Sequence, residues 1–170
     1  MSFDEHLKLS SSSQEVVVTT KDGDQLTVDA SLLRQCKALG LTEGANQPAN
    51  LTVNEVSTPI FKKVLEWCEE HKDLKEPVVQ DHPITGERIR FILNNYEKKF
   101  FDIPADEIME LLTAANYLNL ESMYLFGCQS MAVLLNNKSL EEVRKLLKLQ
   151  DDLTEEQKEA VRKEHAWCGL

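Results

Sequence analysis

The chain has 170 residues, of which 42% are hydrophobic and 28% are charged, an ordinary composition for a soluble globular protein. A chain of this length buries roughly 70% of the surface of its unfolded form, so a stable core needs neither disulfides nor metals. The net charge of −10 argues against nucleic acid as a partner, and no apolar run is long enough to cross a membrane.

The first predicted elements are a disordered tail and a β-hairpin. Residues 1–14 are polar and Ser-rich, with no apolar signal core, so we expect disorder there and no secretion. In the sequence EVVVTTKDGDQLTVDA, apolar residues alternate on both arms and Asp22-Gly23 supply the turn. The alternating residues are Val16, Val18, Thr20, Leu26 and Val28.

A short helix, a strand and a longer helix are predicted next. The sequence SLLRQCKALG places its apolar residues on one side of a helix that stops at Gly40. The sequence ANLTV is typical of a strand in which Leu51 and Val53 face inward. A helix follows over residues 58–71, with Pro59 in its first turn.

The middle of the chain is predicted to contain an exposed loop and then another helix. Residues 71–87 show no periodicity and contain two prolines, one glycine and charges of both signs, which is typical of a loop. The sequence RIRFILNNYEKKFF is predicted to be helical, because Ile92, Tyr96 and Phe100 are spaced by four.

The helix that opens at Pro104 carries an aromatic residue on its polar face. On a helical wheel Tyr117 lies almost opposite the apolar cluster, which consists of Ile108, Leu111, Leu112 and Ala115. An exposed Tyr beside an amide, here Asn116, is typical of recognition surfaces. The alternative is that Tyr117 packs against another segment, such as the loop after His71.

The remaining predicted helices differ in how apolar they are. Residues 120–135 are apolar around much of the helical circumference, which predicts a central helix. The last two helices begin with capping boxes, one formed by Ser139 and Glu142 and the other by Thr154 and Gln157. Their apolar residues are too few for a separate core, so they either cover the main domain or clamp a partner helix. These residues are Val143, Leu147, Leu149, Leu153, Val161 and Trp167.

These elements predict an α+β protein with a small N-terminal sheet followed mostly by helices. We divide the chain into a tail over residues 1–14, a main domain over residues 15–136 and a two-helix extension over residues 137–170. The four cysteines lie in helix-like stretches without a C-x-x-C pair, which indicates free thiols and a cytoplasmic or nuclear location.

No motif points to catalysis or to a cofactor. The nucleophile elbow, the phosphate-binding loop and the zinc-protease signature are all missing from the sequence, so we expect no enzyme activity. One metal site stays open as a minor alternative. Two pairs of possible zinc ligands are each spaced by one helical turn: Cys68 with His71, and His165 with Cys168. The two pairs are far apart in the chain.

Three stretches of the sequence carry a resemblance to a known family. They are the motif Ile60-Phe61-Lys62-Lys63-Val64 with Trp67-Cys68 and His71-Lys72-Asp73, the sequence AANYLNL, and the tail EEVRKLLKLQDDLTEEQKEAVRKEHAWC. Over about residues 15–170 the chain resembles the S-phase kinase-associated, or Skp-type, adaptors of SCF ubiquitin ligases. The resemblance implies a BTB/POZ-like domain followed by a two-helix extension.

The resemblance also implies partners and the residues that bind them. In that family the BTB portion binds the N-terminal region of a cullin, and Asn116 and Tyr117 match its cullin-facing pair. The later helices hold the F-box motif of a substrate receptor. The residues that match the F-box-facing segment are Val143, Arg144, Leu147, Leu153, Val161, Arg162, Trp167 and Cys168. Without its receptor such a chain is expected to self-associate, for example as a homodimer.

Departures from the family pattern indicate a divergent paralogue. The segment after the hairpin is shorter and less acidic than usual, Tyr96-Glu97 stand where the family has a Trp-Asp pair, and Leu140 replaces a proline. These changes leave two alternatives to a cullin adaptor. One is a BTB-type protein that self-associates, and the other is a paralogue that binds F-box proteins without engaging a cullin.

Overall fold

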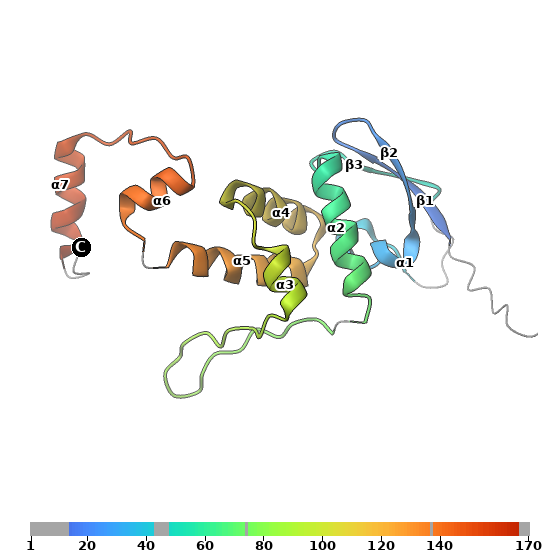
Figure 1. The fold of residues 1–170 in the computed structure, drawn as a ribbon, viewed down its shortest axis with the longest axis horizontal. Coiled ribbons are helices and arrows are strands. Elements are labelled where there is room, and N and C mark those ends of the chain that lie inside the picture. Colours follow the sequence, from blue (N-terminus) through green and yellow to red (C-terminus); the bar gives the residue numbers. More distant parts are fainter. Residues whose placement is uncertain (1–13, 43–47, 74, 137, 167–170) are drawn as a thin grey trace, which may run out of the picture. The chain divides into compact units, whose positions relative to one another are not determined.

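The structure, a computed structural model, describes residues 14–42, 48–73, 75–136 and 138–166. The chain divides into two compact units, Met1–Leu134 and Leu135–Leu170. The larger unit holds a small sheet and the helices α1 to α5, and the smaller unit holds α6 and α7 (Figure 1).

The sheet has three strands in the order β2-β1-β3. Strand β1, Glu15–Thr20, pairs antiparallel with β2, Gln25–Asp29, and parallel with β3, Asn50–Val53. Gly23 takes a left-handed φ of 85° in the hairpin turn, which confirms the predicted hairpin. The alternation is also confirmed, because Val16, Val18 and Thr20 are buried while the residues between them are partly exposed.

The single short helix predicted after the hairpin is wrong. Helix α1, Ala30–Leu33, and a 3-10 turn, Lys37–Leu39, are separated by Cys36, whose ψ of 84° is not helical. The break allows the Cys36 side chain to be fully buried, while Gln35 Nε2 donates to the carbonyl of Cys68 at 2.6 Å. Burial against α2 therefore outweighs helix continuity in this segment.

Helix α2, Thr58–Glu70, begins where predicted and is held at its start by the hairpin turn. The Thr58 amide donates to Asp22 Oδ2 at 2.6 Å, and the Thr58 hydroxyl donates to Asp24 Oδ2 at 2.8 Å. The two carboxylates satisfy donors at the positive end of the helix dipole. Near the other end of α2, Trp67 is fully buried among aromatic rings that include Phe101 and Phe126.

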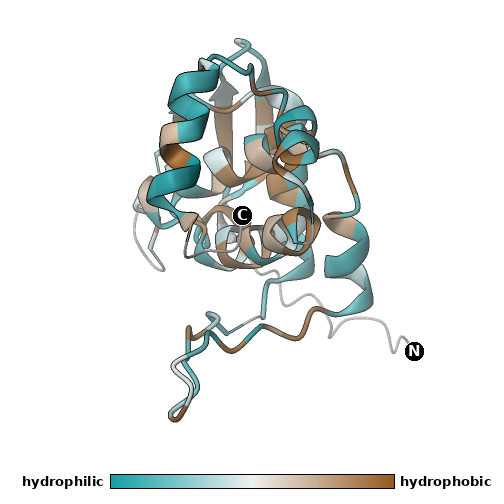
Figure 2. Ribbon diagram, turned by 90° about the vertical axis from the view of Figure 1, so that its left-hand side faces the viewer, coloured by the Kyte–Doolittle hydropathy of each residue, from teal (hydrophilic) through white to brown (hydrophobic). Residues whose placement is uncertain are grey.

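The segment between α2 and α3 is an exposed arm, as predicted, except that its first residue, His71, is buried. The arm also extends further along the chain than the predicted residues 71–87. The arm extends away from the helices and turns back, and its two sides are joined by one antiparallel bridge between Asp81 and Arg88 (Figure 1). Its tip includes hydrophobic residues (Figure 2). The helix predicted from residue 88 is wrong. Helix α3 is only Asn95–Phe100, and Ile92 is 97% exposed in a stretch that is neither helix nor strand. An Asn94–Glu97 capping box fixes the later start.

Helices α4, Ala105–Leu118, and α5, Glu121–Leu135, complete the larger unit. Asn119 joins them with a left-handed φ of 52°. The prediction that α5 is central holds for only one side of it. Met123 and Phe126 are buried, but Tyr124 and Val133 are 39% and 57% exposed. Helix α5 is therefore apolar on faces that the described residues do not cover.

The smaller unit contains α6, Leu140–Leu146, and α7, Glu155–Glu164. Both predicted capping boxes are confirmed, because Ser139 accepts from the Glu142 amide and Thr154 accepts from the Gln157 amide. None of the residues described in this unit, 135–136 and 138–166, is fully buried. A helical pair of this kind has no core of its own.

Candidate protein-binding surfaces

Helix α4 presents a row of exposed side chains that we call the α4 surface, consisting of Met109, Thr113, Asn116 and Tyr117. Tyr117 is 39% exposed and Met109 is 46% exposed. The two are eight residues apart, with Thr113 midway, so all three lie along one stripe of the helix. The outward direction predicted for Tyr117 is confirmed by this exposure.

The opposite side of α4 explains why the α4 surface is rigid. Ile108, Leu111 and Ala115 are fully buried in the core of the larger unit. The Thr113 hydroxyl donates to the Met109 carbonyl at 2.8 Å, so this hydrogen bond holds the side chain against the helix. A partner would meet a preformed patch and would pay little ordering entropy there.

A groove of about 530 Å³ lies beside the α4 surface. Its walls come from α4, from the hairpin turn and from the start of α2 with the residues before it: Lys21, Asp22, Glu55, Val56, Ser57, Ile60, Met109, Glu110, Thr113 and Ala114. Acidic side chains outnumber the single lysine, so the groove favours basic or neutral groups of a partner. Met109 and Thr113 were not predicted as site residues, although their positions eight and four residues before Tyr117 are the signal that would have found them.

The smaller unit carries a second set of exposed apolar residues, which we call the tail surface. It contains Val143 and Leu147, which are half-buried, and Leu153 and Val161, which are 40% and 48% exposed. Leu140 and Leu149 are 60% and 57% exposed. Leu149 was predicted as part of the apolar stripe of the tail, but neither residue was among the predicted F-box-facing residues. Apolar side chains this exposed in a small unit are typical of a surface that another molecule covers.

The two predicted arginines of the tail have different surroundings. Arg144 lies 3.3 Å from Asp151, and only 19% of its side chain is exposed, so it serves the internal structure of the unit. Arg162 pairs with Glu159 of its own helix at 3.6 Å and stays on the surface. The predicted site residues Trp167 and Cys168 lie outside the described residues.

Asp151, in the connection between α6 and α7, pairs with Arg144 of α6 and with Lys158 of α7. Lys158 Nζ lies 2.7 Å from Asp151 Oδ2 and 2.8 Å from Glu155 Oε1, and these hydrogen bonds lower the pKa of both carboxyls. The hydrogen bond from the Ser139 amide lowers the pKa of Glu142 in the capping box. Charged contacts therefore position the tail surface where buried apolar contacts are few.

The described residues offer no metal centre and no transmembrane helix. No group of three or more His, Cys, Asp or Glu residues in the described ranges is placed to hold a metal ion. Both ring nitrogens of His71 are already hydrogen-bonded, and contact with Cys36 together with burial raises the pKa of the Cys68 thiol. These two residues are poor zinc ligands, because metals bind the thiolate and a free ring nitrogen. Within the same ranges, no helix has the length and apolar character needed to span a bilayer.

Two parts of the chain match domains of one protein family. Residues 14–73 match the tetramerisation domain of the Skp1 family, and residues 121–168 match the dimerisation domain of the Skp1 family. SKP1-like protein 11 of Arabidopsis thaliana is 33% identical over 158 residues, which cover 92% of this chain and 98% of that protein. The chain belongs to the Skp1 family. The family identified from the sequence motifs is therefore confirmed.

Two other proteins are similar to the chain over nearly its whole length. The Skp1-related protein of Caenorhabditis elegans is 29% identical over 162 residues, covering 95% of this chain and 90% of that protein. The E3 ubiquitin ligase complex SCF subunit sconC of Arthroderma benhamiae is 27% identical over 161 residues, covering 94% and 98%. The match over residues 14–73 also confirms the predicted BTB/POZ-like α+β fold.

Proposed function

We propose that this Skp1-family chain is a non-enzymatic adaptor of an SCF-type cullin ubiquitin ligase, which joins a cullin to F-box substrate receptors. The observation that carries the proposal is the similarity over 94% of the chain to a protein named as an SCF ubiquitin ligase subunit. An adaptor needs at least two protein-binding surfaces. The exposed α4 surface and the exposed tail surface supply two candidates.

The α4 surface is the proposed binding site for the N-terminal region of a cullin. Asn116 and Tyr117 occupy the positions that the family resemblance assigns to this contact. Tyr117 offers a ring with an exposed edge and a hydroxyl, and Asn116 offers an amide beside it. A rigid aromatic anchor flanked by a polar group is the composition expected at the centre of an interface.

The tail surface is the proposed binding site for an F-box helix pair. Its apolar residues are exposed or half-buried, and no residue described in this unit is fully buried. A helical partner that covered Leu153 and Val161 would give the unit the apolar contacts that it lacks. Trp167 and Cys168, which follow α7 in the sequence, belong to the same proposed site.

Two further properties follow from this proposal. Without an F-box partner the exposed tail surface favours self-association, so we propose a homodimer for the unliganded chain. The adaptor is proposed to work in the cytoplasm and the nucleus, since its cysteines indicate a reducing compartment. Neither nucleic acid nor a membrane is proposed as a partner, because the net charge is −10.

The experiment is copurification of the full chain with a cullin N-terminal fragment and an F-box peptide, each added alone and both together. A ternary complex in size-exclusion chromatography is the expected result. Binding of the F-box peptide alone would identify the paralogue that does not engage a cullin. A chain that binds neither protein but forms oligomers would identify the self-associating BTB-type protein.

A further inference from the structure

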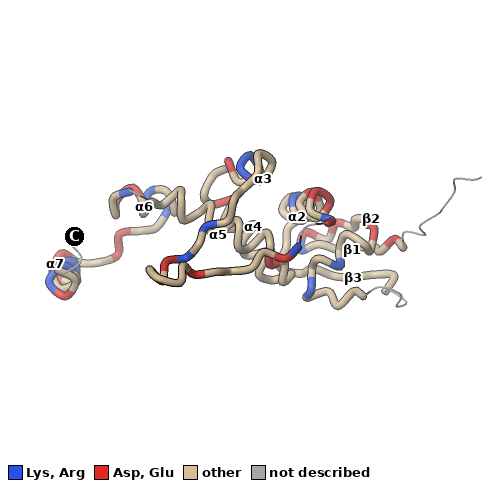
Figure 3. The backbone as a smooth tube through the Cα atoms, turned by 90° about the horizontal axis from the view of Figure 1, so that it is seen from below, with Lys and Arg blue, Asp and Glu red and all other residues tan. Residues whose placement is uncertain are grey.

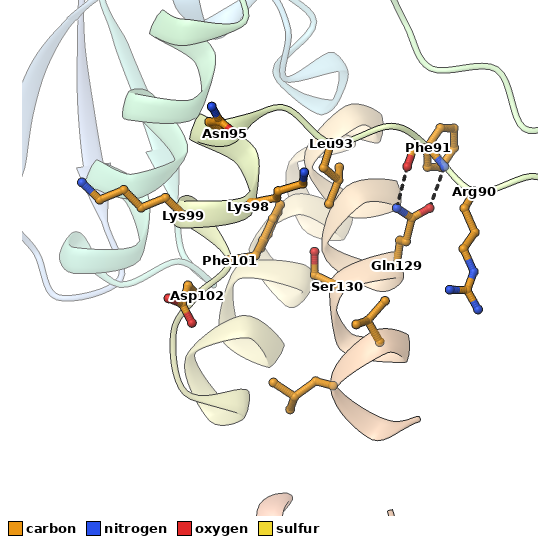
Figure 4. Close-up of a pocket in the computed structure, with 12 residues that line it drawn as sticks. Arg90, Phe91, Leu93, Asn95, Lys98, Lys99, Phe101, Asp102, Gln129 and Ser130 are labelled. Atoms are coloured by element: carbon orange, nitrogen blue, oxygen red, sulfur yellow. Dashed lines mark hydrogen bonds between the residues drawn. The ribbon is translucent and has the colours of Figure 1, made fainter. Parts of the chain in front are cut away.

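A groove on the larger unit combines an apolar floor with basic side chains. It has a volume of about 740 Å³ and lies between the extended backbone before α3, α3 itself and the second half of α5 (Figure 4). Its apolar lining consists of Phe91, Leu93, Phe101, Val133 and Leu134. It shares no lining residue with the groove beside the α4 surface.

The charge of this groove is opposite to that of the chain. Three of its lining residues, Arg90, Lys98 and Lys99, are basic, and only Asp102 is acidic, whereas the whole chain carries −10. Figure 3 shows a basic stretch on α3 next to an acidic residue. Figure 4 shows that Lys98 extends toward Leu93 and that Arg90 stands beyond Gln129, while Lys99 points away. Arg90 and Lys98 are thus the two cations available at the groove.

Contacts between distant segments hold the groove open. The side-chain amide of Gln129 binds both backbone groups of Phe91: Oε1 accepts from the amide at 2.7 Å, and Nε2 donates to the carbonyl at 2.9 Å. The Phe91 ring packs on Phe126 with centroids 5.1 Å apart, and the Asn94–Glu97 capping box fixes the start of α3. A groove built this way exists before a ligand arrives, which lowers the cost of binding.

We propose that this groove binds an acidic, extended segment of another protein that carries at least one bulky apolar side chain. The apolar side chain would cover Phe91 and Leu93, and flanking carboxylates would pair with Lys98 and Arg90. Free phosphate is a poor match, since the two cations come from separate elements and the floor between them is apolar. The proposal is independent of cullin and F-box binding.

The test uses fluorescence anisotropy with the full chain and a short labelled peptide in which aspartates and glutamates flank one Phe and one Leu. We expect saturable binding that weakens as ionic strength rises. The double variant Arg90→Glu with Lys98→Glu should weaken binding by at least about tenfold. Its matched control is Lys62→Glu with Lys75→Glu, which changes the net charge equally at two exposed lysines outside the groove and should weaken binding less than about twofold.

Two comparison peptides and one further variant complete the test. A peptide with lysines in place of the acids, and a peptide with serines in place of Phe and Leu, should each bind at least about tenfold more weakly. Val133→Ser, at a 57% exposed groove position, should weaken binding without changing the thermal transition. The proposal would be overturned if the groove variant and the control variant lost peptide affinity equally. It would also be overturned if a single-stranded RNA bound more tightly than the peptide and lost affinity in the same groove variant. Loss of a homodimer in the groove variants with no acidic-peptide binding would overturn it as well.

Discussion

His71 Nε2 lies 3.2 Å from Glu97 Oε1, and only 4% and 5% of the two side chains are exposed. The other ring nitrogen of His71 lies 2.9 Å from the Trp67 carbonyl, which only accepts, so Nδ1 carries a proton. The His71 ring also stacks on Trp67 with centroids 3.9 Å apart. This pair joins the end of α2 to the start of α3 across the exposed arm, and it does so inside the aromatic core.

Replacing His71 with Ala should lower the free energy of unfolding by about 3 kcal/mol. The substitution leaves Glu97 buried without its partner and removes the ring stacked on Trp67. Urea unfolding followed by tryptophan fluorescence measures the change. The control is Lys72→Ala, which breaks a pair with Glu69 whose side chains are about half exposed, and it should cost less than about 0.5 kcal/mol. Equal losses in the two variants would contradict a structural role for the buried pair.

Ser122→Ala should cost about 1 to 2 kcal/mol of unfolding free energy, because the Trp67 indole loses its hydrogen-bond acceptor. Trp67 Nε1 donates to Ser122 Oγ at 3.1 Å, and both residues are buried. Ser130→Ala on the same helix is the matched control. The Ser130 hydroxyl donates only to the Phe126 carbonyl of its own helix, so its loss should be nearly neutral. The same urea titration compares the variants, and an unchanged Ser122→Ala would contradict the prediction.

The features that could be predicted from the sequence are the ones encoded within a few residues. Each of these features depends on local spacing or on one backbone conformation. They are the hairpin turn at Gly23, the capping boxes at Ser139 and Thr154, and the outward position of Tyr117. Local hydrogen bonds and helical periodicity set these features. The outward direction of Tyr117 could be predicted because it lies opposite an apolar stripe on its own helix. The assignment of site residues to a cullin and to an F-box came from the family resemblance and stays a prediction.

Contacts between distant residues explain the predictions that failed. The spacing of Ile92, Tyr96 and Phe100 suggested one helix, but Gln129 binds the backbone of Phe91 across 38 residues and holds that stretch extended. The basic groove is built by the same long-range contact and had no local signal. The exposed faces of α5 were missed because apolar composition alone does not reveal which faces lack a neighbour.

Acidification should unfold α6 and α7 before it unfolds the larger unit. Hydrogen bonds lower the pKa of Glu142, Asp151 and Glu155 in the folded chain. A carboxyl group whose pKa is lower in the folded chain than in the unfolded chain stabilises the fold at pH values above its ordinary, unfolded pKa. That stabilisation is lost as the pH falls through the pKa of the folded chain. Far-ultraviolet circular dichroism should therefore show a first loss of helix between about pH 5 and pH 2, ahead of a second loss that reports unfolding of the larger unit.

Glu142→Gln is the control for this acid transition. A glutamine keeps the capping box, as Gln157 does after Thr154, but it does not titrate. The variant should retain the helix content of the wild type at neutral pH and lose less of it in acid. If its acid transition matched that of the wild type, the carboxyl groups of the smaller unit would not set the transition.

Leu153→Asp combined with Val161→Asp should weaken binding of an F-box peptide by more than about tenfold. The two side chains are 40% and 48% exposed, so the folded chain tolerates the change. Binding is weakened because an interface that excludes water would bury two unpaired charges. Calorimetry measures the affinity, and light scattering tests whether self-association is lost as well. Gln150→Asp places a carboxylate at an exposed polar position of the same unit and should leave both properties unchanged.

Tyr117→Lys should weaken binding of a cullin N-terminal fragment by more than about tenfold, because the substitution replaces an aromatic anchor with a charge. Tyr124→Lys is a matched control, since Tyr124 is also 39% exposed but lies on α5, outside the α4 surface. Thr113→Lys, within the α4 surface, should weaken binding as Tyr117→Lys does. Surface plasmon resonance on the full chain separates the three variants. A Tyr117→Lys chain with wild-type affinity, or one no weaker than Tyr124→Lys, would remove the α4 surface from the cullin interface.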